Sequence, residues 1–181
     1  MSRPSARIPA VDLAAPQLYF SRELAALEFN FRVLAMARDA GVPLLERVRY
    51  MSIVANNLDE FFEVRVAMLK HHHAYGSAAP GPDGVPSGEL LARIRTRVLD
   101  LVAEVYAAWQ EQIRPQLEHE QIHILTRRQW TPRQQRWLQG YFEHEVLPVL
   151  SPLGLDPAHP FPRILNKTLN IAVVLKGRDA F

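Results

Sequence analysis

The sequence predicts a mainly α protein: an N-terminal antiparallel helical bundle followed by the truncated start of an α/β (α+β) domain. Apolar residues recur at helical spacing in long stretches of the first 121 residues, as in helices that pack against one another. The 48% hydrophobic and 22% charged fractions are those of an ordinary globular chain. One strand-like run, LNIAVVL at residues 169–175, closes the chain without a visible partner strand, so we expect the second domain to be incomplete.

The first predicted helix follows a flexible tail, residues 1–16, that is rich in Ala, Pro and Ser. Ser21 is a suitable N-cap, and the helix is expected to run to about residue 40. Gly41 and Pro43 are expected to stop it, because glycine favours the end of a helix and proline cannot continue one.

The next stretch contains an asparagine pair that allows two interpretations. A second helix starts at Pro43–Leu44 and reaches Asn56–Asn57. In the first interpretation, Asn57 caps a third helix, residues 58–74, with Glu60 as its capping-box partner. In the second, one helix runs through both asparagines. The sequence pattern does not separate these two.

A third long helix is expected after residues 76–88, GSAAPGPDGVPSG, which form the clearest internal linker loop. Ser87 is expected to cap this helix, and Pro115 to end or kink it. These features predict one helical N-terminal domain over residues 17–121.

The start of the second, incomplete domain is predicted over residues 122–181. At the boundary, Gln121–Leu125 alternates like a short strand. Thr131–Pro132 is a strong start signal for a helix to about residue 147, since a cap is followed by proline in the first turn. The run at 169–175 is predicted to be a buried strand.

The composition excludes several classes of site. The chain contains no cysteine, which rules out thiol catalysis, cysteine-based zinc sites and disulfides. No apolar stretch approaches the length of a membrane span. The net charge of +2 does not by itself demand a polyanionic partner. The phosphate-binding pattern GxxxxGK[ST] does not occur.

Two residues between positions 44 and 70 are candidate ligand contacts. Arg65 falls in the middle of an apolar helix face, where a buried guanidinium needs a carboxylate or phosphate partner. An internal ion pair, or a side chain that reaches the solvent edge, competes there with contact to a ligand. Asn57 is either a helix cap or an amide that offers a donor and an acceptor to a base or sugar.

The runs RELAALEFNFRVL, VPLLERVRYMSI, NNLDEFFEVRVAMLK and LDPAHPFPRILNKTLNIAVVL together resemble the polyphosphate kinase family, of the long, histidine-phosphorylated class. The resemblance extends from about Tyr19 to Phe181, and its blocks occur in the family's order. The last run resembles the start of the family's head domain. One departure is visible, because Ala25–Ala26 stand where the family usually has Ser-Trp.

The resemblance implies an enzyme that transfers the terminal phosphate of ATP to polyphosphate, through a phosphohistidine and with Mg²⁺. It implies that Asn57, the second asparagine of Asn-Asn-Leu-Asp, contacts the adenine of ATP. None of the seven histidines matches the family's phosphoacceptor motif. The catalytic histidine and the Mg²⁺ ligands are therefore expected in C-terminal domains outside these 181 residues, and residues 1–181 alone are expected to be inactive.

The implied partners are ATP, polyphosphate, the C-terminal domains of the same chain and further copies in a homo-oligomer. The implied location is cytoplasmic, either free or membrane-associated as a complex.

The alternative function is a non-catalytic helical module that binds a protein or a nucleic acid, although no aromatic-plus-basic signature supports nucleic acid. Two sets of basic residues could line a polyphosphate path, but solvated helix faces are the commoner explanation. The first set is Arg47, Arg49, Arg65 and Lys70, and the second is Arg93, Arg95, Arg97, Arg127 and Arg128. His71–His73 are expected at a solvated helix end, because adjacent side chains on a helix diverge.

Overall fold

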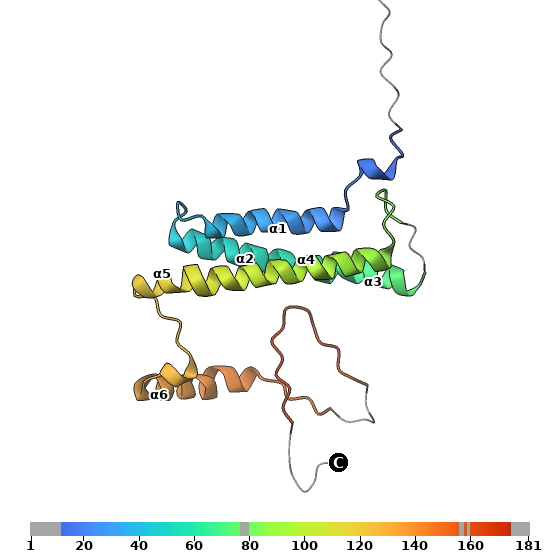
Figure 1. The fold of residues 1–181 in the computed structure, drawn as a ribbon. Coiled ribbons are helices and arrows are strands. Elements are labelled where there is room, and N and C mark those ends of the chain that lie inside the picture. The colour runs from blue at the N-terminus through green and yellow to red at the C-terminus, as the bar shows by residue number, and fades with distance from the viewer. Residues whose placement is uncertain (1–11, 77–79, 156–157, 159, 175–181) are drawn as a thin grey trace, which may run out of the picture. The chain divides into compact units, whose positions relative to one another are not determined.

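The computed structural model describes residues 12–76, 80–155, 158 and 160–174 (Figure 1). The chain divides into two compact units, with the division after His123. The predicted domain boundary after residue 121 stays a prediction.

The first unit begins with a short 3₁₀ helix, η1 (Pro16–Leu18), and helix α1 (Arg22–Arg38). Ser21 caps α1 as predicted: its Oγ accepts a hydrogen bond from the backbone N–H of Leu24 at 3.3 Å. Such a cap satisfies one of the free N–H groups at the helix start. Of the predicted flexible tail, residues 1–11 lie outside the described part of the chain.

The second and third predicted helices are one continuous helix, which decides between the two interpretations of the asparagine pair. Helix α2 (Leu44–Glu60) passes directly into the π-helical segment η2 (Phe61–Val66) and then into α3 (Ala67–Ala74). The capping role considered for Asn57 is therefore wrong. In a helix interior the backbone N–H groups bond to the preceding turn and need no side-chain cap.

Helix α4 (Ser87–Ala108) continues through the π-helical η3 (Trp109–Ile113) into α5 (Arg114–His119). Pro115 does not end the helix, because it follows a wider π turn, a local change that accommodates a residue without an N–H group. The predicted cap at Ser87 is also wrong. Pro86 precedes the helix, and the Ser87 hydroxyl instead lies 3.0 Å from His73 Nδ1.

These three long helical stretches form the predicted antiparallel bundle, in which α1 packs against α2 and α4, and α3 packs against α4 (Figure 1). Its core has two neighbouring clusters of buried apolar side chains. The first is Leu34, Ala37, Met51, Val54, Leu101, Ala108, Ile113 and Leu117, and the second is Leu27, Phe61, Val66, Leu90, Ile94 and Val98. Leu58 packs against both clusters, so one hydrophobic core runs along the bundle.

The strand predicted at Gln121–Leu125 is wrong, because α5 ends there in a tight helix-stop motif. Gln121 has a left-handed φ of 61°. The backbone N–H of Ile122 donates to the Leu117 carbonyl at 2.8 Å, and that of Gln121 donates to the Glu118 carbonyl at 3.1 Å. This is the Schellman pattern, which satisfies the last carbonyls of a helix and is incompatible with extended backbone at its centre.

The second unit contains η4 (Arg127–Gln129), α6 (Pro132–Tyr141), η5 (Phe142–Val146) and η6 (Leu147–Val149). The predicted start of α6 is confirmed, since Thr131 and Gln134 form a reciprocal capping box. The strand predicted at 169–175 is wrong for its described residues, 169–174, which form no ladder. Leu169 is 92% exposed. A strand needs a partner for its backbone hydrogen bonds, and none of the described residues supplies one here.

Candidate functional site

The candidate site is an open groove of about 400 Å³ on the first unit, between α1 and the helix α2–η2–α3. Its lining residues recur at helical spacing on both sides, so each helix contributes a single stripe of side chains. Helix α1 supplies Arg22, Ala26, Phe29 and Asn30, and the opposite helix supplies Asn57, Glu60, Phe61, Val64, Arg65 and Met68.

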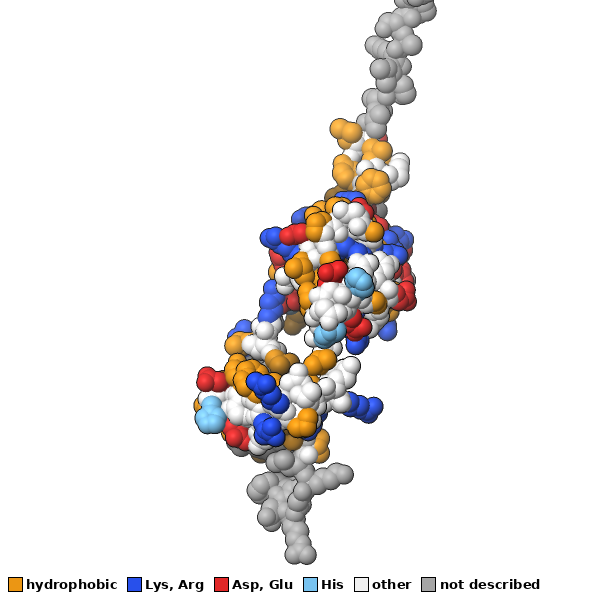
Figure 2. Space-filling view, turned by 90° about the vertical axis from the view of Figure 1, so that its left-hand side faces the viewer, with side chains coloured by type: hydrophobic (Ala, Val, Ile, Leu, Met, Phe, Trp, Pro, Cys, Tyr) orange, Lys and Arg blue, Asp and Glu red, His pale blue; other side chains and the backbone are white. Residues whose placement is uncertain are grey.

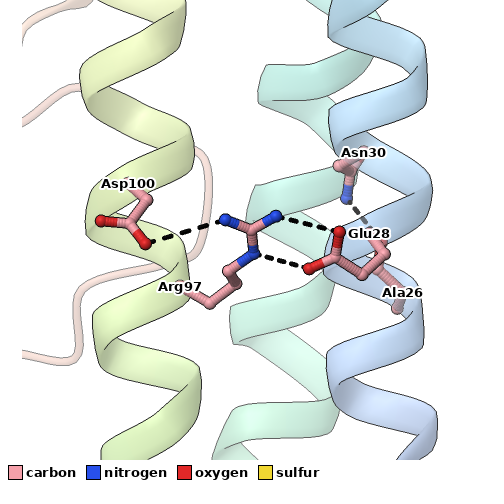
Figure 3. Close-up of polar contacts among 5 residues, drawn as sticks. All are labelled: Ala26, Glu28, Asn30, Arg97 and Asp100. Atoms are coloured by element: carbon pink, nitrogen blue, oxygen red, sulfur yellow. Dashed lines mark hydrogen bonds and ion pairs between the residues drawn. The ribbon is translucent and has the colours of Figure 1, made fainter.

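Two asparagines link the walls of the groove. The Asn57 side chain donates from Nδ2 to Oδ1 of Asn30 at 2.8 Å. Asn30 is only 3% exposed, and its own Nδ2 donates to the Ala26 carbonyl at 3.3 Å, as Figure 3 shows. A buried amide costs free energy unless it is hydrogen-bonded, so these two hydrogen bonds stabilise a polar group at the edge of the apolar core.

Asn57 keeps hydrogen-bonding capacity toward the groove. It is half-buried, and its amide has two N–H donors and a carbonyl oxygen. One donor binds Asn30, and no described residue donates to its Oδ1. The second N–H and the carbonyl oxygen therefore remain for a ligand. That pair of groups matches any planar molecule with a donor beside an acceptor.

Apolar side chains flank Asn57 along the groove. Phe29 is 50% exposed, Val64 is 53% exposed and Met68 is 54% exposed. Large apolar side chains that remain open around a few polar groups are typical of small-molecule sites. The groove can thus hold a flat apolar ring against its walls while one amide orients it.

Arg65 lies half-buried in the groove lining and forms no ion pair with any described residue. The internal ion pair considered for it is wrong within that part of the chain. The alternative of a side chain at the edge of the apolar face fits, because Phe61 and Val66 on either side are buried. Arg22 lines the same groove, so two guanidinium groups border it.

An exposed ion pair connects helices α1 and α4. Arg97 of α4 donates from Nε and Nη2 to the two carboxylate oxygens of Glu28 on α1, at 2.6 and 2.9 Å (Figure 3). The Arg97 guanidinium also lies 3.6 Å from the centre of the Phe31 ring. The hydrogen bond from Arg97 is the main cause that holds the pKa of Glu28 below its ordinary value.

Two of the basic residues considered as a path for polyphosphate, Arg47 and Arg49, make contacts within the helical unit. Arg47 is 3% exposed, and it donates to the Ala37 carbonyl and to Gln116 Oε1, both at 2.7 Å. Arg49 is exposed and pairs with Glu46 at 3.8 Å. On the face drawn in Figure 2, acidic and basic side chains of the helical unit are mixed rather than separated into one basic surface.

The histidine tract lies at the exposed end of α3, as predicted. Among the described residues, no group of three histidine or acidic side chains could hold a metal ion together. Within the same part of the chain, every helix is too short or too polar to cross a bilayer.

Comparison with known proteins decides the family. The model of the polyphosphate kinase N-terminal domain matches residues 19–125, and that of the polyphosphate kinase middle domain matches residues 133–181. The chain belongs to the polyphosphate kinase family. The resemblance stated from the sequence blocks is therefore confirmed.

Relatives in this family match the chain over most of its length. A polyphosphate kinase of Xylella fastidiosa is 52% identical over 166 residues, which are 92% of this chain and 24% of the relative. One of Neisseria meningitidis is 49% identical over 88% of this chain and 23% of the relative. One of Pseudomonas putida is 44% identical over 98% of this chain and 24% of the relative. The chain thus spans about a quarter of the length of these relatives.

A solved structure supports the fold of this family member. The crystal structure of polyphosphate kinase from Porphyromonas gingivalis matches with a TM-score of 0.61 and 30% sequence identity. The match covers 80% of this chain and 20% of that one. The predicted helical N-terminal bundle is confirmed by this likeness and by the helices described above.

Sequence reasoning identified Asn57 and Arg65 but missed Asn30 and Phe29. A signal for Asn30 was present, because it lies three residues after Leu27 and four before Leu34 on the apolar stripe of its helix. A polar residue on such a stripe needs a partner. The identity of that partner depends on the packing of another helix.

Proposed function

We propose that this chain is the N-terminal part of an enzyme that transfers the terminal phosphate of ATP to polyphosphate through a phosphohistidine. In this proposal the groove holds the adenine ring, and Asn57 contacts its edge. Membership of the polyphosphate kinase family supports the activity. The observation that carries the groove's part is the Asn57 amide, which retains one donor and one acceptor beside exposed apolar side chains.

The chemistry of adenine fits this arrangement. Adenine presents an amino donor next to a ring-nitrogen acceptor, and an asparagine amide pairs with such an edge through two hydrogen bonds. Phe29 and Met68 offer apolar surface to the ring faces. Arg22 and Arg65 place positive charge at the same groove, which favours a ligand that carries phosphates.

The phosphoryl transfer itself is proposed to lie outside residues 1–181, in segments that correspond to the rest of the relatives' length. The proposed enzyme uses Mg²⁺ held by those segments, works as a homo-oligomer and is cytoplasmic. Mg²⁺ would supply neutralisation of phosphate charge during transfer. Polyphosphate synthesis by purified residues 1–181 alone would contradict this division of roles.

The test is Asn57→Ala in the full-length enzyme, with Asn56→Ala as the matched control, because Asn56 is exposed and is not part of the groove lining. Loss of two hydrogen bonds to the base is expected to raise the KM for ATP about tenfold. The kcat at saturating ATP and the KM for polyphosphate should stay within about twofold, since neither depends on the base contact.

Thermal unfolding of each variant separates binding from folding. Asn57→Ala removes the partner of the buried Asn30 oxygen, so a modest fall in Tm is expected even when the site works as proposed. An unchanged KM for ATP together with a lowered Tm would show that Asn57 is a structural residue only.

A further inference from the structure

We infer that Asn30 is a positioning residue that makes the groove select adenine over guanine, by fixing which end of the Asn57 amide faces the base. The inference rests on the proposed function, because it concerns the same contact. It assigns a role to a buried side chain that acts through its hydrogen bond with Asn57.

The first step is that an unrestrained asparagine does not distinguish the two purines. Adenine has an amino group at position 6, which donates, beside the ring nitrogen N1, which accepts. Guanine has a carbonyl oxygen at position 6, which accepts, beside an N1–H group, which donates. An amide that rotates by half a turn exchanges its own donor and acceptor, and so matches either base. Selection therefore requires that the amide be held in one orientation.

The second step is the hydrogen-bond chain behind Asn57. The Ala26 carbonyl is an acceptor only, and it receives a hydrogen bond from Nδ2 of Asn30 at 3.3 Å. This contact turns Oδ1 of Asn30 toward the groove. That oxygen also only accepts, so Asn57 has to present Nδ2 to it, as it does at 2.8 Å. The backbone carbonyl thus sets the orientation of both side chains.

The third step is that neither side chain can rotate freely. If Asn57 alone rotates, two carbonyl oxygens face each other across the helix contact. If both asparagines rotate, the oxygen of Asn30 faces the oxygen of Ala26 instead. Since Asn30 is 3% exposed, two opposed acceptors at this contact would cost free energy. In the observed orientation, each of the two hydrogen bonds joins a donor to an acceptor.

The experiment compares ATP and GTP as phosphate donors for the full-length enzyme, with wild type, Asn30→Leu and Asn30→Asp. Leucine keeps the volume but removes both hydrogen bonds, so the Asn57 amide is free to rotate. We expect the ratio of kcat/KM for ATP to that for GTP to fall about tenfold, which corresponds to one well-placed hydrogen-bond contact. The change should come from KM, with kcat at saturating ATP within about twofold.

Asn30→Asp is the rescue variant. In its buried site the aspartic acid is favoured in its protonated form, whose hydroxyl donates to Ala26 while its carbonyl oxygen accepts from Asn57. The ATP-to-GTP ratio should then stay at the wild-type value, although the side chain has changed. A merely structural role for Asn30 would not separate the two variants in this ratio.

The outcomes distinguish this inference from the proposed function. If Asn30→Leu keeps the wild-type ratio while Asn57→Ala raises the KM for ATP, Asn30 does not position the amide and the inference is wrong. If Asn57→Ala leaves the KM for ATP unchanged, the adenine site itself is wrong. Asn30→Ala, with the same expected fall in the ratio, replaces the leucine variant if that variant does not fold.

Discussion

Arg97 on α4 holds both carboxylate oxygens of Glu28 on α1 while its guanidinium lies over the ring of Phe31, 3.6 Å from the ring centre. A planar guanidinium can make these contacts together, whereas a lysine ammonium is a point charge without a second parallel donor. The pair is solvent-exposed, with side-chain exposures of 36% and 49%, so its contribution to stability is modest.

Arg97→Lys is therefore expected to lower the free energy of unfolding of the 181-residue chain by about 1 kcal/mol, through loss of the two-point contact and the stacking. Urea unfolding followed by circular dichroism measures this change. Arg95→Lys is the control, since Arg95 is exposed and forms no ion pair with a described residue, and it should change stability by less than about 0.5 kcal/mol. Equal effects of the two substitutions would show that the geometry of Arg97 contributes nothing.

The same pair predicts a pH dependence. Hydrogen bonding by Arg97 lowers the folded-state pKa of Glu28 below its ordinary value of 4.5, so the unfolded chain takes up this proton first as the pH falls. The contribution of Glu28 to stability is thus complete above about pH 4.5 and is lost as the pH falls through the folded-state pKa. Unfolding of wild type and Glu28→Gln should differ at pH 7 and converge in acid. A difference that grows as the pH falls would contradict the assigned shift.

Arg47 predicts a larger effect, because it is buried. Its Nε satisfies the Ala37 carbonyl in the last turn of α1, and its Nη1 bonds to Gln116 of α5. Positive charge at a helix C-terminus is favourable, and unpaired carbonyls there are costly. Arg47→Met keeps the aliphatic stem but leaves two acceptors without this donor, so the free energy of unfolding should fall by about 2 to 3 kcal/mol.

The control for Arg47 is Arg49→Met, two residues along the same helix. Arg49 is exposed, and its contact with Glu46 is 3.8 Å long, so a change of less than about 0.5 kcal/mol is expected. Urea unfolding at neutral pH compares the two variants directly. Similar losses for both would mean that Arg47 contributes only its charge, and that its buried hydrogen bonds add little.

Local sequence signals predicted the parts of the fold that depend on neighbouring residues. Ser21 and Thr131 cap their helices as expected, because a cap involves only the residues two or three positions further along the chain. The same local reasoning failed at Ser87, whose hydroxyl is paired with His73 from another helix. It also failed at Gln121, the first residue of the expected strand, which lies instead in the Schellman motif that ends α5.

By itself, the sequence determined the helical bundle, the apolar stripes that form its core and membership of the polyphosphate kinase family. It also singled out Asn57, but left open whether that residue caps a helix or lies within one. Only the tertiary structure decided that Asn57 lies inside a continuous helix and binds Asn30, 27 positions away. Spacing along one helix specifies which side chains share a face, whereas the partner across an interface depends on how two helices pack. The burial of Arg47 was decided in the same way, by the meeting of α1, α2 and α5.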